Sequence, residues 1–157
     1  MTILKKILLI LFILFVAIQF IQPEKNQTTA KSPDDIFAHY PAPDSIKMMI
    51  RTSCYDCHSN HTNYPWYAQI QPLAWWLDHH IEEGKNELNF SDFAAFNVRF
   101  KSHKLDEVME EVKGEEMPLK SYLIAHTEAR LTKPQRAAIV KWADGLRNSI
   151  KPRKNEK

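Results

Sequence analysis

Only three glycines occur among the 157 residues of this chain, too few for the tight turns of a multi-stranded antiparallel sheet. No segment alternates apolar and polar residues with the period of two that is typical of a half-buried strand. Apolar residues make up 44% of the chain, which is too many for a disordered protein. Several segments instead repeat apolar residues at helical spacing. We therefore expect an all-α fold built around one small helical domain.

Capping residues and apolar stripes predict five helices in the body of the chain. Asp44 and Ser45 begin the first helix, which runs to Cys54. Pro72 begins the second helix, and we expect it to end at Gly84. The other three are a helix capped by Ser91 and Asp92, a helix over residues 105–113 stopped by Gly114, and a last helix behind the capping box of Thr132 and Gln135.

Residues 1–22 have the pattern of a membrane-anchor helix. Lys5 and Lys6 precede an Ile/Leu/Phe run over residues 7–21, which makes about 22 Å of helix against a hydrocarbon core of roughly 30 Å. Ile3 and Leu4 lengthen this run. A cleaved signal peptide is the alternative, although no small-residue cleavage site follows the run. The lysines on the N-terminal side predict that the rest of the chain lies outside the cytoplasm.

Three further segments follow the anchor. Residues 23–43 are polar and proline-containing and are expected to be a linker, residues 44–150 the folded domain, and residues 151–157 a basic tail. Without the terminal lysines and the tail, the chain has 15 basic and 18 acidic residues. A body with that balance does not have the positive surface of a nucleic-acid-binding protein.

Both cysteines of the chain lie in the segment Cys54-Tyr-Asp-Cys-His58. Positions three apart on a helical turn share a face, so both sulfurs can reach one flat molecule. The histidine that follows can place its imidazole over the centre of that molecule. Two thioether bonds and an axial imidazole are the requirements for covalent attachment of haem. The spacing therefore predicts one haem c bound by Cys54 and Cys57, with His58 on its iron.

Other uses of the two cysteines have less support in the sequence. A thioredoxin-like dithiol needs a βαβ setting, and none is predicted. A disulfide across a loop this short gains little from loop closure. A zinc site made of the two cysteines, His58 and His61 remains an alternative, without the second cysteine pair that is usual in such sites.

The second axial ligand decides between an electron carrier and a catalyst. Met117 is the candidate, because it follows Gly114 outside a predicted helix and Pro118 favours an extended backbone before it. It lies far enough after His58 for the chain to return over the other face of the macrocycle. An open site is one alternative. Histidine ligation is another, with the candidates His61, His79, His80 and His126.

An aromatic cluster follows the cysteines closely in the sequence. Such side chains exclude water from a haem pocket and thereby raise its reduction potential, although ordinary core packing explains them equally well. The residues expected to form a pocket wall are Tyr64, Trp66, Tyr67 and Trp76.

These motifs resemble two known groups of proteins. The Cys-x-x-Cys-His segment, the downstream Met-Pro pair and a final helix with Trp142 resemble the layout of class I cytochromes c. More narrowly, the chain is similar over residues 33–148 to a haem-binding domain family of bacterial envelope proteins. That resemblance implies a covalent haem c with His58 as proximal and Met117 as distal ligand. The segments that carry it are Cys54-Tyr-Asp-Cys-His-Ser59, Asn63-Tyr-Pro-Trp-Tyr67, Trp75-Trp76 and Met117-Pro118.

From these features we expect an electron carrier without enzymatic activity of its own. It is a monohaem c-type cytochrome, held by residues 1–22 in the bacterial inner membrane with its domain in the periplasm. Its partners are redox proteins of the cell envelope. The alternative is a haem-based sensor or a peroxidase-like enzyme with an open or weakly held distal site.

Overall fold

The computed structural model describes residues 2–150, and within these residues every regular element is helical. The prediction of an all-α fold is confirmed. Gln27 and His61 form an isolated antiparallel β-bridge, which belongs to no strand among residues 2–150. The elements are α1 (Ile3–Ile18), α2 (Ile36–His39), α3 (Asp44–Ser53), α4 (Tyr55–His58), η1 (Trp66–Gln69), α5 (Leu73–Glu87), η2 (Phe90–Ala95), α6 (Val98–Gly114), α7 (Tyr122–Ala125), η3 (Thr127–Ala129) and α8 (Lys133–Ile150).

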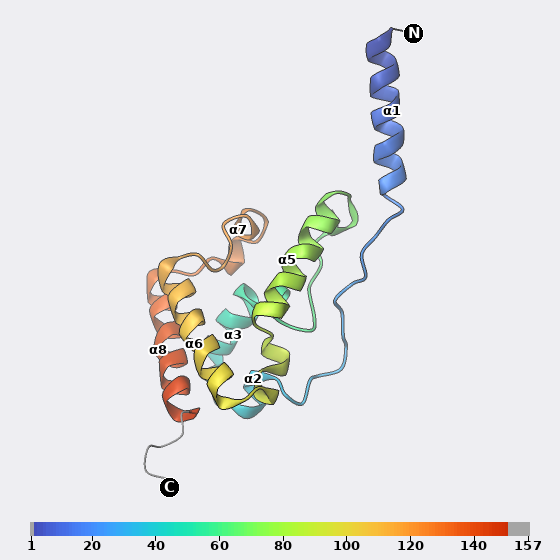
Figure 1. Cartoon of the computed structure of the whole chain (residues 1–157). Coiled ribbons are helices and arrows are strands. Elements are labelled where there is room, and N and C mark those ends of the chain that lie inside the picture. The colour runs from blue at the N-terminus through green and yellow to red at the C-terminus, as the bar shows by residue number, and fades with distance from the viewer. Residues whose placement is uncertain (1, 151–157) are drawn as a thin grey trace.

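The long helices α6 and α8 pair in opposite directions along one side of the body (Figure 1). Arg136 near the start of α8 bonds the carbonyl of Val112 near the end of α6. Arg147 near the end of α8 pairs with Asp106 in the middle of α6. The shorter helices α2, α3 and α4 pack beside this pair, and α5 lies beyond them. The predicted capping box is present at α8, where the Thr132 backbone N–H donates to the Gln135 side chain over 2.8 Å.

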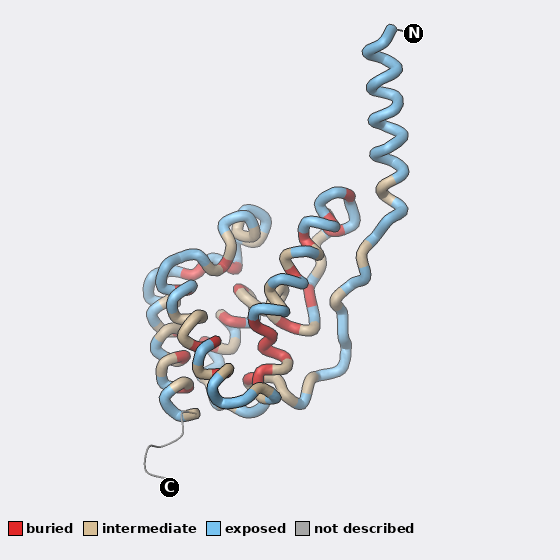
Figure 2. Tube along the Cα trace, viewed as in Figure 1, coloured by how far each residue is buried: buried red, intermediate tan, exposed pale blue. Residues whose placement is uncertain are grey.

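The hydrophobic core lies where α3, η2, α6 and α8 meet, shown by the buried segments in Figure 2. It removes large apolar side chains from water, and this burial is the main favourable contribution to the stability of the domain. A smaller cluster of Ala68, Leu77 and Ile81 joins α5 to η1. The buried members of the main core are Ile36, Ile46, Ile50, Leu88, Phe90, Phe93, Leu105, Val112, Leu131, Ile139, Ala143 and Leu146.

Gly84 does not end a helix, which corrects the prediction for the second helix. α5 continues through Gly84 to Glu87. The glycine serves close packing instead, because a Cβ atom at this position would lie 2.8 Å from the carbonyl oxygen of Cys57. The absence of a side chain lets α5 lie directly against the turn that carries the cysteines.

The two helices predicted over residues 91–113 are also corrected. The residues around Ser91 form the short 3-10 helix η2, and α6 then runs unbroken from Val98. Asparagines supply the caps: Asn89 accepts from the Ser91 N–H over 3.0 Å, and Asn97 accepts from the Phe100 N–H over 2.9 Å. Gly114 is the last residue of α6, and Glu115 takes the left-handed conformation with φ of 62°.

The N-terminal helix α1 projects from the body (Figure 1), and after Lys5 and Lys6 all of its residues 7–18 are apolar. It has 16 residues, and no helix within residues 2–150 is long and apolar enough to cross a membrane.

Residues 23–43, expected to be a linker, contact the body. Ile36 of α2 is fully buried in the core, and the Asn26 side chain donates to the Ser59 carbonyl over 2.8 Å. The predicted basic tail, residues 151–157, lies outside the described residues.

Candidate functional site

A single helical turn carries both cysteines. α3 ends at Ser53, Cys54 leaves the helical conformation with φ of −128°, and α4 begins again at Tyr55. The backbone N–H groups of Cys57 and His58 both donate to the Cys54 carbonyl, over 3.2 and 2.9 Å. This geometry places the three functional side chains of the motif on one compact turn.

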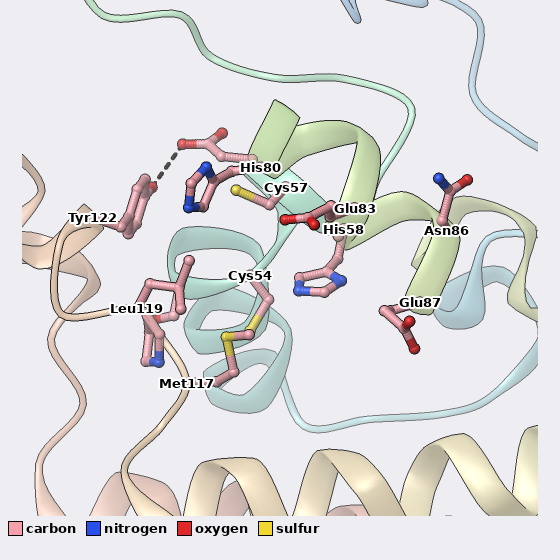
Figure 3. Close-up of a pocket in the computed structure, with 14 residues that line it drawn as sticks. Cys54, Cys57, His58, His80, Glu83, Asn86, Glu87, Met117, Leu119 and Tyr122 are labelled. Carbon is pink, nitrogen blue, oxygen red and sulfur yellow. Dashed lines mark hydrogen bonds between the residues drawn. The ribbon is translucent and has the colours of Figure 1, made fainter. Parts of the chain in front are cut away.

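A cavity of about 500 Å³ opens beside this turn, within the range of about 300–1,000 Å³ that is usual for pockets holding small molecules and cofactors. Figure 3 shows the side chains that line it. They come from α3 and α4, from the second half of α5, and from the segment that joins α6 to α7. The four residues predicted as haem ligands or attachment points all lie on this lining: Cys54, Cys57, His58 and Met117.

The imidazole of His58 is held in one tautomer. Its Nδ1 atom lies 2.9 Å from the carbonyl oxygen of Leu88, and a carbonyl only accepts, so Nδ1 carries the proton and donates. Nε2 is then the unprotonated nitrogen, the form that binds a metal. Phe90 packs against the ring edge, with ring centroids 6.2 Å apart. Burial lowers the pKa of His58, which keeps the ring neutral at physiological pH.

Both cysteines are free thiols held in apolar surroundings. Burial raises the pKa of Cys54 to about 12 and that of Cys57 to about 11. The thiolate of Cys57 would also lie near the carboxylate of Asp56, which disfavours a second negative charge. The folded protein therefore holds both sulfurs as neutral thiols.

Met117 reaches the cavity from a segment whose backbone is firmly held. After the left-handed residue at the end of α6, the N–H groups of Glu116 and Met117 donate to the Glu111 carbonyl over 3.1 and 3.2 Å. The Met117 carbonyl accepts a 2.7 Å hydrogen bond from Arg136 of α8. The same guanidinium nitrogen donates to the Val112 carbonyl over 3.0 Å. Two long helices thus fix the position of the thioether.

Of the four histidines that compete with Met117, His80 is the one on the cavity lining. Its Nδ1 atom donates to the Trp76 carbonyl over 2.8 Å, so in the neutral ring Nε2 is the nitrogen without a proton. The others have different neighbours: His79 faces Glu83 on the surface, His61 contacts the Thr28 carbonyl, and His126 lies between Tyr67 and Glu128.

None of the four aromatic residues expected to form a pocket wall is on the cavity lining. Trp66 and Trp76 are exposed. Tyr64 and Tyr67 pack on the small cluster beneath Cys57, and the Tyr64 hydroxyl accepts from the Asn26 N–H over 2.9 Å.

Two residues that no sequence motif indicated, Asp56 and Tyr122, also line the cavity. Figure 3 labels Tyr122. The Tyr122 hydroxyl donates to the Asp56 carboxylate over 2.7 Å. Burial and this carboxylate raise the pKa of Tyr122, so the phenol stays protonated and the bond is kept. Leu119 lies on the lining from the same segment. No motif signals Tyr122, since its partner is 66 positions away in the sequence.

The zinc alternative has no assembled ligand set in the part of the chain that the structure describes. Among residues 2–150, no three His, Cys, Asp or Glu side chains are grouped to hold a metal ion. His61, the fourth ligand of that alternative, instead lies 3.2 Å from the Thr28 carbonyl through its Nδ1 atom.

Comparisons with known proteins place the chain in a family. Neither the comparison with curated proteins nor that with solved structures gave a match. A model of a family described as the haem-binding domain matches residues 13–145, from within α1 to near the end of α8. The chain belongs to the haem-binding domain family.

Proposed function

We propose that this haem-binding protein is a membrane-tethered monohaem c-type cytochrome that transfers one electron at a time in the periplasm. A bound haem supplies a single electron, reversibly gained and lost at its iron. The observation that carries the proposal is the meeting of two thiols, one imidazole and one thioether on the same cavity. The protein is an electron carrier in this proposal and not an enzyme.

The donor set fits a covalently attached haem. Cys54 and Cys57 are free and neutral, and they are presented by one turn. Each thiol would add across one vinyl group of a haem, its sulfur bonding one carbon and its hydrogen the other, so attachment would consume no oxidant. The lining is mostly apolar, as suits a porphyrin, while Asp56 and Tyr122 satisfy each other's polar atoms.

Two axial ligands distinguish a carrier from a catalyst. His58 presents Nε2 and is fixed by Leu88, while Met117 is fixed by α6 and α8. A His/Met pair leaves no open coordination position and raises the reduction potential. Both ligands sit on rigid backbone, which limits the reorganisation that accompanies a change of oxidation state.

The N-terminal helix supports the proposed location. After Lys6, α1 is apolar on every side, and a helical segment without a polar face gains most by entering lipid. Lys5 and Lys6 near its start favour a cytoplasmic N-terminus and a domain on the periplasmic face of the inner membrane. Redox proteins of the envelope are the proposed partners.

Intact mass spectrometry of the denatured protein, matured with the haem-attachment machinery, tests the covalent cofactor. We expect the mass of the polypeptide plus one haem. The variant Cys54→Ser with Cys57→Ser should have the mass of the polypeptide alone. A wild-type protein without added mass would refute the c-type assignment.

Absorption spectra with carbon monoxide test the carrier assignment. We expect a ferrous low-spin spectrum that carbon monoxide does not change, because both axial positions are filled. A high-spin spectrum that shifts readily would favour the sensor or peroxidase-like alternative.

A further inference from the structure

Exposed apolar side chains gather where the segment after α1 meets η1 and the start of α5, a surface that we call the apolar collar. Its side chains are Phe20, Ile21, Trp66, Ile70, Leu73 and Trp75. Phe20 and Trp66 are 85% and 75% exposed, and such large aromatic side chains rarely gather on a surface that faces only water. Figure 1 shows the start of α5 beside the end of α1.

Side-chain hydrogen bonds lock the two parts of the collar together. The Gln71 N–H donates to the Gln19 side chain over 2.9 Å, and the Gln71 side chain donates to the Ile21 carbonyl over 2.8 Å. The Trp75 indole N–H donates to the same carbonyl over 3.0 Å. Gln22 donates to the Gln69 carbonyl over 3.2 Å. The family match, which begins at residue 13, includes this end of α1.

Two further side-chain hydrogen bonds satisfy backbone carbonyls at the end of α1 that water normally solvates. The last carbonyls of a helix have no partner within the helix. Here the Gln19 side chain donates to the Phe15 carbonyl over 3.0 Å, and the Gln22 side chain donates to the Gln19 carbonyl over 2.9 Å. Satisfying backbone groups internally is what a lipid environment demands.

The charge pattern matches the same environment. Neither residues 7–23 nor residues 57–77 contain an Asp, Glu, Lys or Arg, and these two stretches supply the whole collar. Tryptophan is the residue that concentrates at membrane–water interfaces, where its ring is apolar and its N–H is bonded. The collar is also continuous with the apolar surface of α1.

We propose that the apolar collar rests in the interfacial layer of a phospholipid bilayer and fixes the orientation of the haem cavity relative to the membrane. The inference rests on the proposed membrane tethering by α1 and goes beyond it, because a tether alone leaves the domain free to turn. α5 carries the collar at its start and the cavity residues Gly84 and Glu87 near its end. The eleven helical steps from Leu73 to Gly84 span about 16 Å along the axis.

Photolabelling from lipid tests the proposal on the full, haem-loaded chain. The protein is reconstituted in vesicles of phosphatidylethanolamine and phosphatidylglycerol that contain a phospholipid with a headgroup-proximal diazirine. After irradiation, adducts are mapped by mass spectrometry. We expect adducts in residues 66–75 and in α1, and only background in the α8 peptide that carries Trp142.

Two matched variants sharpen this test. Leu73→Asp places a charge in the collar, while Val98→Asp places one at the first residue of another helix, at similar exposure (46% and 41%). We expect Leu73→Asp to reduce adducts in residues 66–75 about two- to fivefold, the modest effect of a carboxylate at a bilayer interface. Val98→Asp should leave them unchanged.

The outcomes separate this inference from the tether. Adducts in α1 with only background in residues 66–75 would overturn the collar's contact with lipid and leave the tether in place. Burial of the collar between two copies of the chain would give this result. Background labelling in both regions would overturn the tether and the collar together. Equal adduct yields in the two aspartate variants would also overturn the proposal.

Discussion

His58 and Met117 are held by different means, and the difference matters for the proposed haem site. One hydrogen bond to the Leu88 carbonyl fixes the imidazole of His58 directly. The thioether of Met117 has no polar anchor of its own and depends on its backbone. The methionine is therefore the ligand that a change in its surroundings displaces first.

Replacing Met117 by alanine tests the distal ligand. We expect Met117→Ala to bind carbon monoxide in the ferrous state, because one axial position is then open. His80→Ala serves as the comparison, since His80 is the histidine on the same lining. It should keep the low-spin spectrum. The reverse result, with carbon monoxide binding to His80→Ala and not to Met117→Ala, would assign the ligand to His80.

Arg136 is a positioning residue for Met117. Its guanidinium donates to the carbonyls of Val112 and Met117, so Arg136→Ala removes this donor from both, and the Val112 carbonyl keeps only the longer bond from the Glu115 N–H. We expect a loss of about 1–3 kcal/mol in the free energy of unfolding and partial carbon monoxide binding by the ferrous protein.

Arg130→Ala is the control for this variant. Arg130 is exposed, and its side chain makes no hydrogen bond with any residue from 2 to 150. Denaturant unfolding and ferrous spectra of both variants check the prediction. A stability loss without any carbon monoxide binding would show that Arg136 stabilises the fold and does not position the ligand.

Among single residues, the sequence indicated those site residues that lie close together along the chain. Cys54, Cys57 and His58 are adjacent, so their spacing alone indicates a shared function. The aromatic residues that follow the cysteines in the sequence lie off the cavity lining, because closeness in sequence does not fix closeness in space. Tyr122 reaches the cavity through a loop, and only the folded chain brings it to Asp56.

Among the helices, the contact between α4 and α5 is the one most sensitive to a single added atom. Gly84 lies so close to Cys57 that an alanine Cβ would meet the Cys57 carbonyl at 2.8 Å and its Cβ at 3.1 Å. The nearer atom belongs to the backbone, which cannot rotate away. We expect Gly84→Ala to lower the free energy of unfolding by about 1–3 kcal/mol through overpacking.

Gly145→Ala is the matched control in α8, where an added Cβ meets nothing within 4 Å. It should raise the free energy of unfolding by up to about 1 kcal/mol, because alanine is the better helix former. Chemical denaturation of both variants measures the difference. Equal effects at the two positions would contradict the close-packing role of Gly84.

Helix positions were easier to predict than helix ends. α3 and α8 begin where Asp44 and Thr132 indicated, since both starts carry strong local signals. Gly84 was misread because a glycine either ends a helix or permits close approach, and the local sequence does not distinguish these uses. The start of α6 depends on Asn97, one of several polar residues in that region that are able to cap a helix.

For the whole molecule, the main departure from expectation is the attachment of α1 to the body. Residues 23–43 were expected to be a linker that alone joins the anchor to the domain, but Gln19 and Gln22, at the end of the predicted anchor, bond directly to Gln71 and Gln69 of the body. Gln71 is completely buried among these contacts. The sequence contains no pattern that pairs residues about fifty positions apart, so this attachment was not predictable from it.

Gln19→Ala tests the attachment. The variant loses the acceptor for the Gln71 N–H and the donor to the Gln71 carbonyl. We expect faster hydrogen exchange at the Gln71 amide and a cost of about 1–3 kcal/mol for the opening of residues 69–75.

Gln69→Ala is the matched control, because that side chain is exposed and makes no hydrogen bond to any residue in the described range 2–150. Exchange rates followed by mass spectrometry compare the two variants. Unchanged exchange at Gln71 in the Gln19 variant would mean that α1 and the body move independently.

α5 carries collar residues at its start and the lining residues around Gly84 near its end. The number of residues between them therefore fixes the direction in which Gly84 faces relative to the collar. One inserted residue between Trp76 and Gly84 would rotate the second half of α5 by about 100° and lengthen it by about 1.5 Å. Gly84 would then no longer face Cys57 while the collar kept its place. The stretch between them should therefore tolerate substitutions far better than insertions or deletions.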